Sequence, residues 1–235
     1  MDPLLISAAG GMKARMESLD MLANNIANAG TAGFKSDREF YNLYEQQLPV
    51  IESQWTDFSQ GTLTATGNPL DLALSGKGMF ALNAPTGTVY TRGGQFKISR
   101  SNQLETADGY TARNVLDQGN PITVDPAQPV DILKDGTVQQ SGQTVGQFEI
   151  AAPDSNPLAM SKLGNSYFIM STATAPPAAQ GTDVLQGQIE QSNVPVSESA
   201  VKLVGIMRQF EMLQKAITVG TDMSRRGIEE VAKVV

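Results

Sequence analysis

The spacing of apolar residues divides this chain into three parts, and that division constrains the fold more than any other feature. At both ends, apolar side chains recur every three or four residues, which is the period of an amphipathic helix. Between the ends, glycine and proline are frequent, and apolar residues come in short alternating runs such as residues 70–74 and 95–98. Such a pattern predicts a helix at each end of a β-rich middle part.

The N-terminal pattern predicts a helix of about 25 residues, or roughly 38 Å at 1.5 Å per residue. The apolar face of this helix carries Leu5, Met12, Leu19, Leu22 and Ile26. The pattern stops at residues 28–30, which read Asn-Ala-Gly. Because Asn and Gly adopt the left-handed conformation that ends many helices, we expect the helix to end there.

Three asparagines, Asn24, Asn25 and Asn28, gather at this predicted helix end. Asparagine is a poor helix former, and its side chain offers two donors and two acceptor lone pairs. Capping of a frayed end is the simplest interpretation. Because a matching helix is predicted at the other end of the chain, hydrogen bonding between subunits is the interpretation we favour.

The C-terminal pattern predicts a longer helix. Pro195 lies just upstream, and Ser197 followed by Glu198 is a typical start. From there to Val235 the helix is expected to run over about 35 residues, on the order of 55 Å. Its predicted apolar face carries Leu203, Ile206, Phe210, Leu213 and Ile217.

Neither terminal stripe can be buried by an isolated helix, so each needs a helical partner from its own chain or from a neighbour. We therefore predict an α+β chain that is mainly β. An irregular all-β central domain is flanked by long N- and C-terminal helices that pair as a coiled coil in the assembly. The predicted domains are a terminal helical assembly domain, 1–35 with 195–235, and a β-rich outer domain, 36–194.

Composition excludes several classes of function. The chain has no cysteine and no histidine, so it lacks thiolate chemistry, the commonest general base and the commonest metal ligands. Residues 36–196 hold 16 of the 24 acidic side chains and 8 of the 17 basic ones. This acidic middle part disfavours nucleic-acid binding. We expect no cofactor, no metal and no enzymatic activity.

The sequence also argues against a membrane protein. No apolar run approaches the roughly 18 to 20 residues that a membrane-spanning helix requires. The first residues carry an acid at Asp2 and lack a basic stretch followed by an apolar core. We therefore expect no direct membrane insertion and no cleaved secretory signal peptide.

Blocks of sequence along nearly the whole chain resemble the flagellar rod and hook proteins. The first is Leu-Ala-Asn-Asn-Ile-Ala-Asn at 22–28, followed by Gly-Phe-Lys at 33–35. The second comprises residues 60–63 and 66–72, and the third comprises 76–80 and 90–96, with Leu104 and 108–110 after it. The fourth is Gln-Gly-Gln-Ile-Glu-Gln-Ser-Asn-Val at 186–194, and Gln-Phe-Glu follows it at 209–211.

The resemblance implies a structural subunit of the bacterial flagellar basal-body rod, closest to the proximal rod proteins. Subunits of this family assemble through their terminal helices into a hollow helical drive shaft that spans the periplasm. The implied partners are further copies, other flagellar rod proteins and the flagellar export apparatus, a type III secretion system. The expected assembly interface consists of Leu5, Met12, Leu19, Leu22, Asn24, Asn25, Ile26, Asn28, Leu203, Ile206, Phe210, Leu213 and Ile217.

Three alternatives stay open. One is a distal rod subunit of the same family. Another is a cell-wall-acting enzyme on a β domain, in which two carboxylates suffice without histidine; its candidates are Asp71, Asp108, Asp117 and Asp131. The last is a monomeric adhesin or scaffold, which has no need of two matched terminal helices.

Overall fold

The computed structural model describes residues 3–42, 50–152, 160–164, 166–170 and 179–233. Chain contacts divide it into two compact units. The helical unit comprises Met1–Ala27, Asp37–Thr56 and Val194–Val235, and the β unit comprises Asn28–Ser36 and Asp57–Asn193. The two domains predicted from the sequence, the terminal helical assembly domain and the β-rich outer domain, have other boundaries and stay a prediction.

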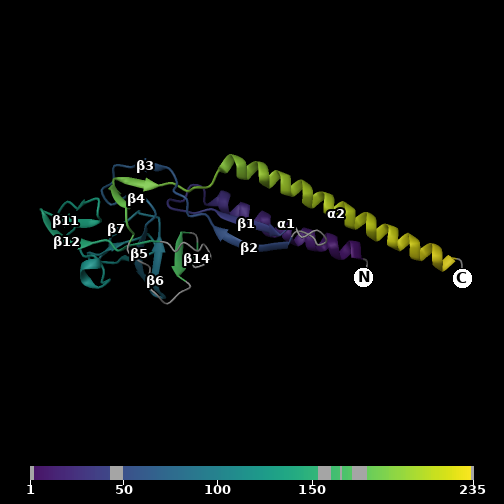
Figure 1. Ribbon diagram of the computed structural model, residues 1–235, viewed down its shortest axis with the longest axis horizontal. Helices are drawn as coiled ribbons and strands as arrows, with labels where there is room; N and C mark the ends of the chain where they lie inside the picture. The colour runs from purple at the N-terminus through teal and green to yellow at the C-terminus, as the bar shows by residue number, and fades with distance from the viewer. Residues whose placement is uncertain (1–2, 43–49, 153–159, 165, 171–178, 234–235) are drawn as a thin grey trace. The chain divides into compact units, whose positions relative to one another are not determined.

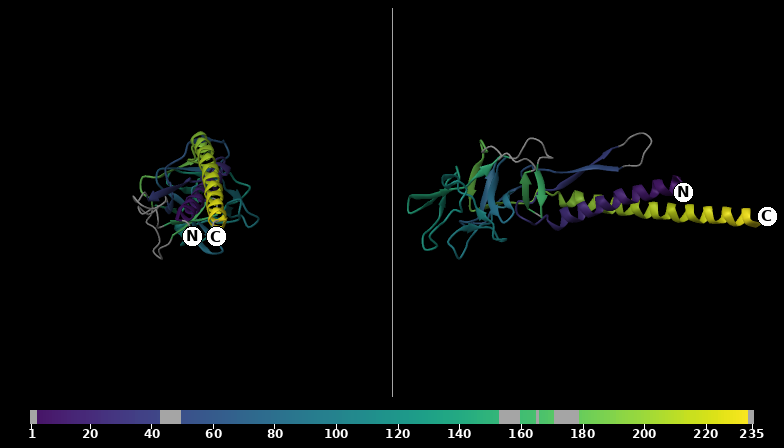
Figure 2. Two further views of the ribbon diagram at one scale, coloured as in Figure 1. Left: turned by 90° about the vertical axis from the view of Figure 1, so that its right-hand side faces the viewer. Right: turned by 90° about the horizontal axis from the view of Figure 1, so that it is seen from below.

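The helical unit contains α1 (Pro3–Ala27), β1 (Asp37–Asn42), β2 (Val50–Thr56) and α2 (Val196–Lys233). The two helices lie side by side (Figure 2) and contact each other. The strands β1 and β2 form an antiparallel hairpin that also contacts α1. Neither helix carries, in its described residues, the long apolar stretch that a bilayer crossing requires.

One face of α1 is buried, and its members lie three or four residues apart, as one helix face requires. They are Ala14, Ser18, Leu22 and Asn25. The polar members have partners on β1: the Ser18 hydroxyl donates to Glu39 Oε2 at 2.7 Å, and the Asn25 side chain forms two hydrogen bonds with the backbone of Asp37. The buried face of α1 is therefore partly polar.

The β unit is built from short strands joined by turns. The strands are β3 (Leu63–Ala65), β4 (Leu72–Ser75), β5 (Met79–Ala84), β6 (Gly87–Thr91), β7 (Lys97–Ile98), β8 (Leu104–Glu105), β9 (Thr111–Ala112), β10 (Asp131–Ile132), β11 (Thr137–Gln140), β12 (Gln143–Gln147), β13 (Ile150–Ala151), β14 (Met160–Leu163), β15 (Tyr167–Met170), β16 (Asp183–Gln186) and β17 (Gln188–Glu190). A single 3-10 turn, η1 (Val115–Asp117), lies among the described residues of this unit.

An eight-stranded sheet is the largest in the β unit, and β5 and β6 lie at its centre (Figure 1). Its hydrogen-bonded order is β14-β15-β6-β5-β9-β8-β7, and β13 pairs with β5. Smaller sheets join β10-β11-β12, β16-β4 and β17-β3. All described pairings are antiparallel.

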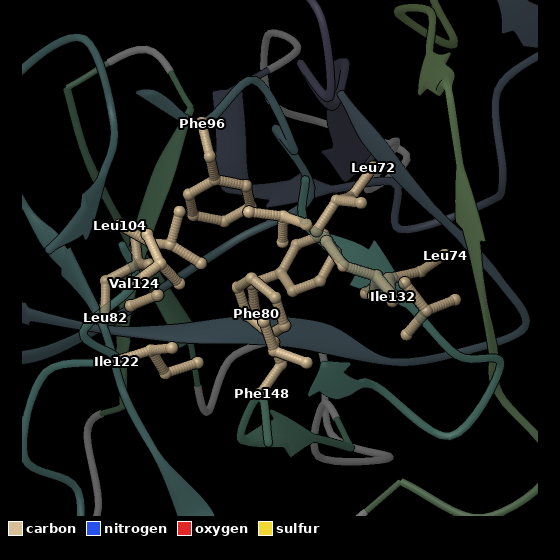
Figure 3. Packing of buried hydrophobic residues seen from close by; sticks show 14 of the residues in the cluster. Leu72, Leu74, Phe80, Leu82, Phe96, Leu104, Ile122, Val124, Ile132 and Phe148 are labelled. Carbon is tan, nitrogen blue, oxygen red and sulfur yellow. The ribbon is translucent and has the colours of Figure 1, made fainter. Parts of the chain in front are cut away.

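The core of the β unit is aliphatic with an aromatic centre, where Phe80, Phe96 and Phe148 converge (Figure 3). The ring centroid of Phe80 lies 5.4 Å from that of Phe96 and 5.5 Å from that of Phe148, in edge-on geometry. Such aromatic contacts add to the stabilisation that burial of the rings provides. Leu72, Leu74 and Leu82 are fully buried around them.

The predicted fold class is wrong as it stands. The described chain has only two α-helices, of 25 and 38 residues in a chain of 235. They are short beside a mostly β remainder, and a mixed α+β organisation fits only in part. The two helices also pack on each other within one chain, whereas the prediction paired them in the assembly. The physical reason is that the spacing of apolar residues indicates which face of a helix is apolar but does not indicate which element covers that face.

Candidate functional site

The chain passes between the two units four times, after Ala27, Ser36, Thr56 and Asn193. On the β-unit side, residues at or near three of these passages are joined to one another and to Arg92 by hydrogen bonds and ion pairs. We call this group the crossing cluster, and it consists of Lys35, Ser36, Asp57, Arg92, Glu190 and Asn193.

Glu190 lies at the centre of the crossing cluster, at the end of β17, and its side chain is fully buried. Its Oε1 atom accepts from Lys35 Nζ at 2.6 Å and from the Gly61 amide at 2.9 Å. Its Oε2 atom accepts from Arg92 Nε at 2.8 Å. The Glu190 carbonyl accepts from the Gly33 amide at 2.8 Å. One residue thus holds three segments that are far apart in the sequence.

Arg92 extends this network into the β unit. Its side chain is 3% exposed, and its guanidinium pairs with Glu190 while also donating to the carbonyls of Leu74, Gly76 and Gly78. A planar guanidinium has five donors in a fixed fork, which suits several acceptors at once. Arg92 therefore satisfies the carbonyl groups of a turn at the same time as it neutralises Glu190.

Lys35 is a fully buried ammonium group with two acceptors, Glu190 Oε1 and the Ser59 carbonyl. Burial lowers the pKa of Lys35, and the charge and hydrogen bond of Glu190 oppose that shift. The neighbouring Phe34 is also fully buried, and Lys162 Nζ lies 4.2 Å from the centre of its ring. Residues 34 and 35 are therefore fixed by both apolar and ionic contacts.

Asn193 connects two of the passages through its side-chain amide. Its Oδ1 atom accepts from the Ser36 amide at 2.8 Å, and its Nδ2 atom donates to the Asp57 carbonyl at 2.7 Å. Nδ2 also lies within hydrogen-bond distance of the carbonyl and hydroxyl of Ser59. The Asp57 amide donates to the Ser36 carbonyl at 2.9 Å. The residues that border three passages are therefore bonded to one another.

Two glycines permit the close backbone approach that the crossing cluster needs. A Cβ atom on Gly33 would lie 2.2 Å from the Gly93 amide nitrogen, and one on Gly61 would lie 2.0 Å from the Gln191 carbonyl oxygen. Gly33 also has a φ of 70°, in the left-handed region where side chains are strained. Both positions therefore exclude any larger residue.

None of the predicted interface residues belongs to the crossing cluster, and all of them except Asn28 lie on the two helices. On α1, Leu22 and Asn25 are buried, Met12, Leu19 and Ile26 are half-buried, Asn24 is exposed, and Leu5 lies near the start of the helix. Asn28 is buried in the turn after α1, in the β unit. The five residues of α2, Leu203, Ile206, Phe210, Leu213 and Ile217, are half-buried. Their role as an interface stays a prediction.

The sequence reasoning missed Lys35, Arg92 and Glu190 as a group. A signal was present, because each is a charged residue within a glycine-rich or apolar block that carries the family resemblance. Charged side chains are seldom fully buried unless they are paired. The pairing itself joins residues 155 positions apart, and no local pattern reports such a distance.

The chemistry of the crossing cluster is structural. Its carboxylate is saturated by two cations and an amide, and the described residues contain no group of three acidic side chains close enough to hold a metal ion. The carboxylates proposed for the enzyme alternative have separate bonds: Asp71 accepts from Asn68, and Asp108 accepts from the Tyr167 hydroxyl. The site favours a role in holding segments together.

Three family models match the chain in separate regions. Residues 5–35 match the flagella basal body rod protein, residues 73–140 the flagellar hook protein FlgE/F/G D1 domain, and residues 185–230 the flagellar basal body rod FlgEFG protein C-terminal region. A FlgF basal-body rod protein of Caulobacter vibrioides is 34% identical, with 98% of each chain covered. The chain belongs to the flagellar basal-body rod proteins.

Other relatives of this rod protein are named either FlgF or FlgG. A FlgF of Mesorhizobium japonicum is 33% identical over 90% of each chain, and a FlgG of Caulobacter vibrioides is 32% identical over 93% of this chain and 95% of its own. The predicted family is confirmed, and so is the role of structural rod subunit; the relatives named FlgF show in addition that the chain is close to FlgF. Lys35, Arg92 and Glu190 each come from a different one of the three matched regions, so the crossing cluster joins all three.

Proposed function

We propose that this rod protein is a subunit of the proximal part of the rod and assembles through α1 and α2 into a hollow helical drive shaft. The single observation that carries this proposal is a second apolar row on α2. The helix presents one apolar row that is half-buried and another that is exposed to solvent. An exposed apolar row on a helix marks an interaction site.

The geometry of α2 separates these rows. Val201, Met212, Val219 and Met223 are spaced by close to whole helical turns, so they lie on one face. They are between 57% and 74% exposed. The half-buried row, from Leu203 to Ile217, lies roughly on the opposite face, and because α1 packs along α2 we infer that this row contacts α1. The exposed row is left for a neighbouring subunit.

The partners follow from this arrangement. We infer that neighbouring copies and other rod proteins pack on the exposed row of α2, and that head-to-tail contacts build a helical array, since heterologous contacts that do not close give open assemblies. The finer parts of the proposal are recognition by the flagellar export apparatus, a periplasm-spanning location and the absence of enzymatic activity.

The test introduces two charges into the exposed row and leaves the half-buried row unchanged. In Met212→Glu/Val219→Glu, two carboxylates would have to be buried at a subunit contact, which is costly. We expect the purified variant to keep its helical content, and cells that carry it as their only copy to lose swimming and rods. Thr218→Glu adds a charge at an exposed polar position of the same helix and is expected to swim normally. Normal rods with the double variant would contradict the proposal.

The distal part of the rod is the second candidate position, because the FlgG relatives are nearly as similar as the FlgF relatives. Basal bodies from cells that lack the protein distinguish the two positions. A proximal subunit predicts that rod assembly stops early, whereas a distal subunit predicts a short rod that lacks only its outer part.

A further inference from the structure

The crossing cluster is more elaborate than four simple connections between two units require. A single backbone segment joins the units at each passage, and such a segment can be pulled out of a unit one hydrogen bond at a time. Here, residues that border three of the passages are bonded to one another, and Gly33, five residues after Asn28, is bonded to Glu190. Pulling on one segment therefore loads several bonds together.

We propose that the crossing cluster is a mechanical clamp, in which Asn193 and Glu190 are the positioning residues that pass force from the terminal segments into the core of the β unit. The inference rests on the proposed function only for the source of the force, because the subunits of a drive shaft carry torque. The clamp itself is a property of the single chain.

The first component of the clamp is Asn193, which borders the last passage, the one that leads into α2. Its side chain holds both the Ser36 amide and the Asp57 carbonyl. Force that reaches residue 193 along the backbone must therefore break these bonds together before β17 can separate from β3. Bonds loaded together resist more force than the same bonds loaded in turn.

The second component is Glu190, three residues further into the β unit. Its carboxylate is fully buried between Lys35 and Arg92, and Arg92 is bonded to carbonyls of the β4–β5 region. Separating the ions would leave buried charges unpaired, which is strongly unfavourable. Glu190 thus links the terminal segments to strands whose apolar side chains are buried in the core.

The β unit contains a matched ion pair outside the clamp. Arg113 Nε donates to Glu149 Oε2 at 2.9 Å, and the two side chains are 23% and 29% exposed. Neither residue borders a passage between the units. Glu149→Gln therefore removes the same kind of charge from the same unit without altering the clamp.

Single-molecule force spectroscopy on the full chain tests the proposal. Because the chain has no cysteine, Ala127→Cys and Ala200→Cys supply two exposed attachment points, one in each unit. We expect the parent to break in one high-force event. Asn193→Ala, which leaves all three buried charges paired, should lower the force of that event and divide it into steps, and Glu190→Gln should lower it further. Glu149→Gln should leave it unchanged.

A force unchanged in Asn193→Ala, or lowered equally in Glu149→Gln, would overturn the clamp. Amide exchange supplies a measurement without force: loss of the Asn193 bond should speed exchange of the Ser36 amide about tenfold, with the core amide of Leu104 unaffected. Equal acceleration at both amides would mean general unfolding and would also overturn the proposal. Neither measurement depends on rod membership, so a strain that lacks the protein yet builds complete rods would refute the proposed function and leave the clamp standing.

Discussion

At the scale of single residues, the decisive feature is a glutamate that serves three segments. A buried ion pair is not in itself a strong source of stability, because desolvation of the ions offsets their attraction. Removing one partner is different, because it leaves the other charge buried and unpaired. In this chain Glu190 neutralises both Lys35 and Arg92, so its loss would leave two buried cations facing each other.

Glu190→Gln is therefore expected to destabilise the β unit by about 3–5 kcal/mol. The amide keeps the shape of the side chain but not its charge. Glu149→Gln, at the partly exposed pair with Arg113, is expected to cost less than about 1 kcal/mol. Chemical denaturation of the full chain, followed by a signal from the β unit, measures both. Equal losses in the two variants would show that Glu190 has no special role.

Tyr167 predicts how stability changes at alkaline pH. Burial raises the pKa of Tyr167, and its hydrogen bond to Asp108, 2.5 Å long, raises it further. An unfolded tyrosine loses its proton near about pH 10, whereas the folded one keeps it. Above that pH the folded state binds more protons than the unfolded state, so the free energy of unfolding falls as pH rises.

In Tyr167→Phe the free energy of unfolding should decrease less steeply with pH above about pH 10. A part of the decrease should remain, because burial also raises the pKa of Tyr90. Below that pH the variant should show no change in the pH dependence. Denaturation curves collected across the alkaline range measure both slopes. Parallel curves for the variant and the parent would contradict the assignment to Tyr167.

At the scale of elements, the sequence predicts where helices begin and end better than it predicts which elements pair with each other. Helix boundaries follow from local chemistry: α1 ends at Ala27, directly before the Asn-Ala-Gly stop, and α2 starts at Val196, next to the predicted Ser197. Pairings such as β16 with β4 and β17 with β3 join strands more than 100 residues apart. They depend on a common core, which a periodic pattern does not reveal.

The same limit applies to the hairpin of β1 and β2. Its strands lie within the region that we assigned to the outer domain, yet they pack with α1 in the helical unit. Two buried side chains of α1 link the helix to β1: Asn25, bonded to the backbone of Asp37, and Ser18, bonded to Glu39. From the sequence, the favoured interpretation of the asparagine cluster is hydrogen bonding between subunits. For Asn25 the bonds in the structure lie within one chain.

Glycine substitutions test how tightly the elements of the crossing cluster approach one another. Gly33 and Gly109 both have positive φ, of 70° and 85°. A Cβ atom on Gly109 would contact nothing within 4 Å, whereas one on Gly33 would overlap the backbone at Gly93. Gly109→Ala should cost about 1–2 kcal/mol, from backbone strain alone.

Gly33→Ala should lower the free energy of unfolding by clearly more than Gly109→Ala. The backbone strain is the same, but the new Cβ atom would also overlap the backbone at Gly93, which cannot rotate out of the way as a side chain can. Thermal unfolding of the two variants and the parent, at matched concentration, measures the difference. If Gly33→Ala were no more harmful than Gly109→Ala, then the approach of residue 33 to the Arg92–Gly93 segment would be looser than the structure describes.

At the scale of the whole molecule, the chain divides its tasks between two units. The helical unit holds the exposed apolar row of α2, and the β unit holds the crossing cluster and the aromatic core. The family resemblance in the sequence was sufficient to predict a rod subunit. It was not sufficient to predict the clamp, because Lys35, Arg92 and Glu190 meet only in the folded chain.

The most direct test of the central claim, that this protein is a structural subunit of the rod, is electron cryomicroscopy of purified basal bodies. The bodies come from cells in which the chain carries a small tag at the exposed β11–β12 turn, residues 141–142, and from cells that lack the chain. We predict tag density on the rod of the first sample and an interrupted rod in the second. A complete rod without the chain, or a tag elsewhere than on the rod, would contradict the account.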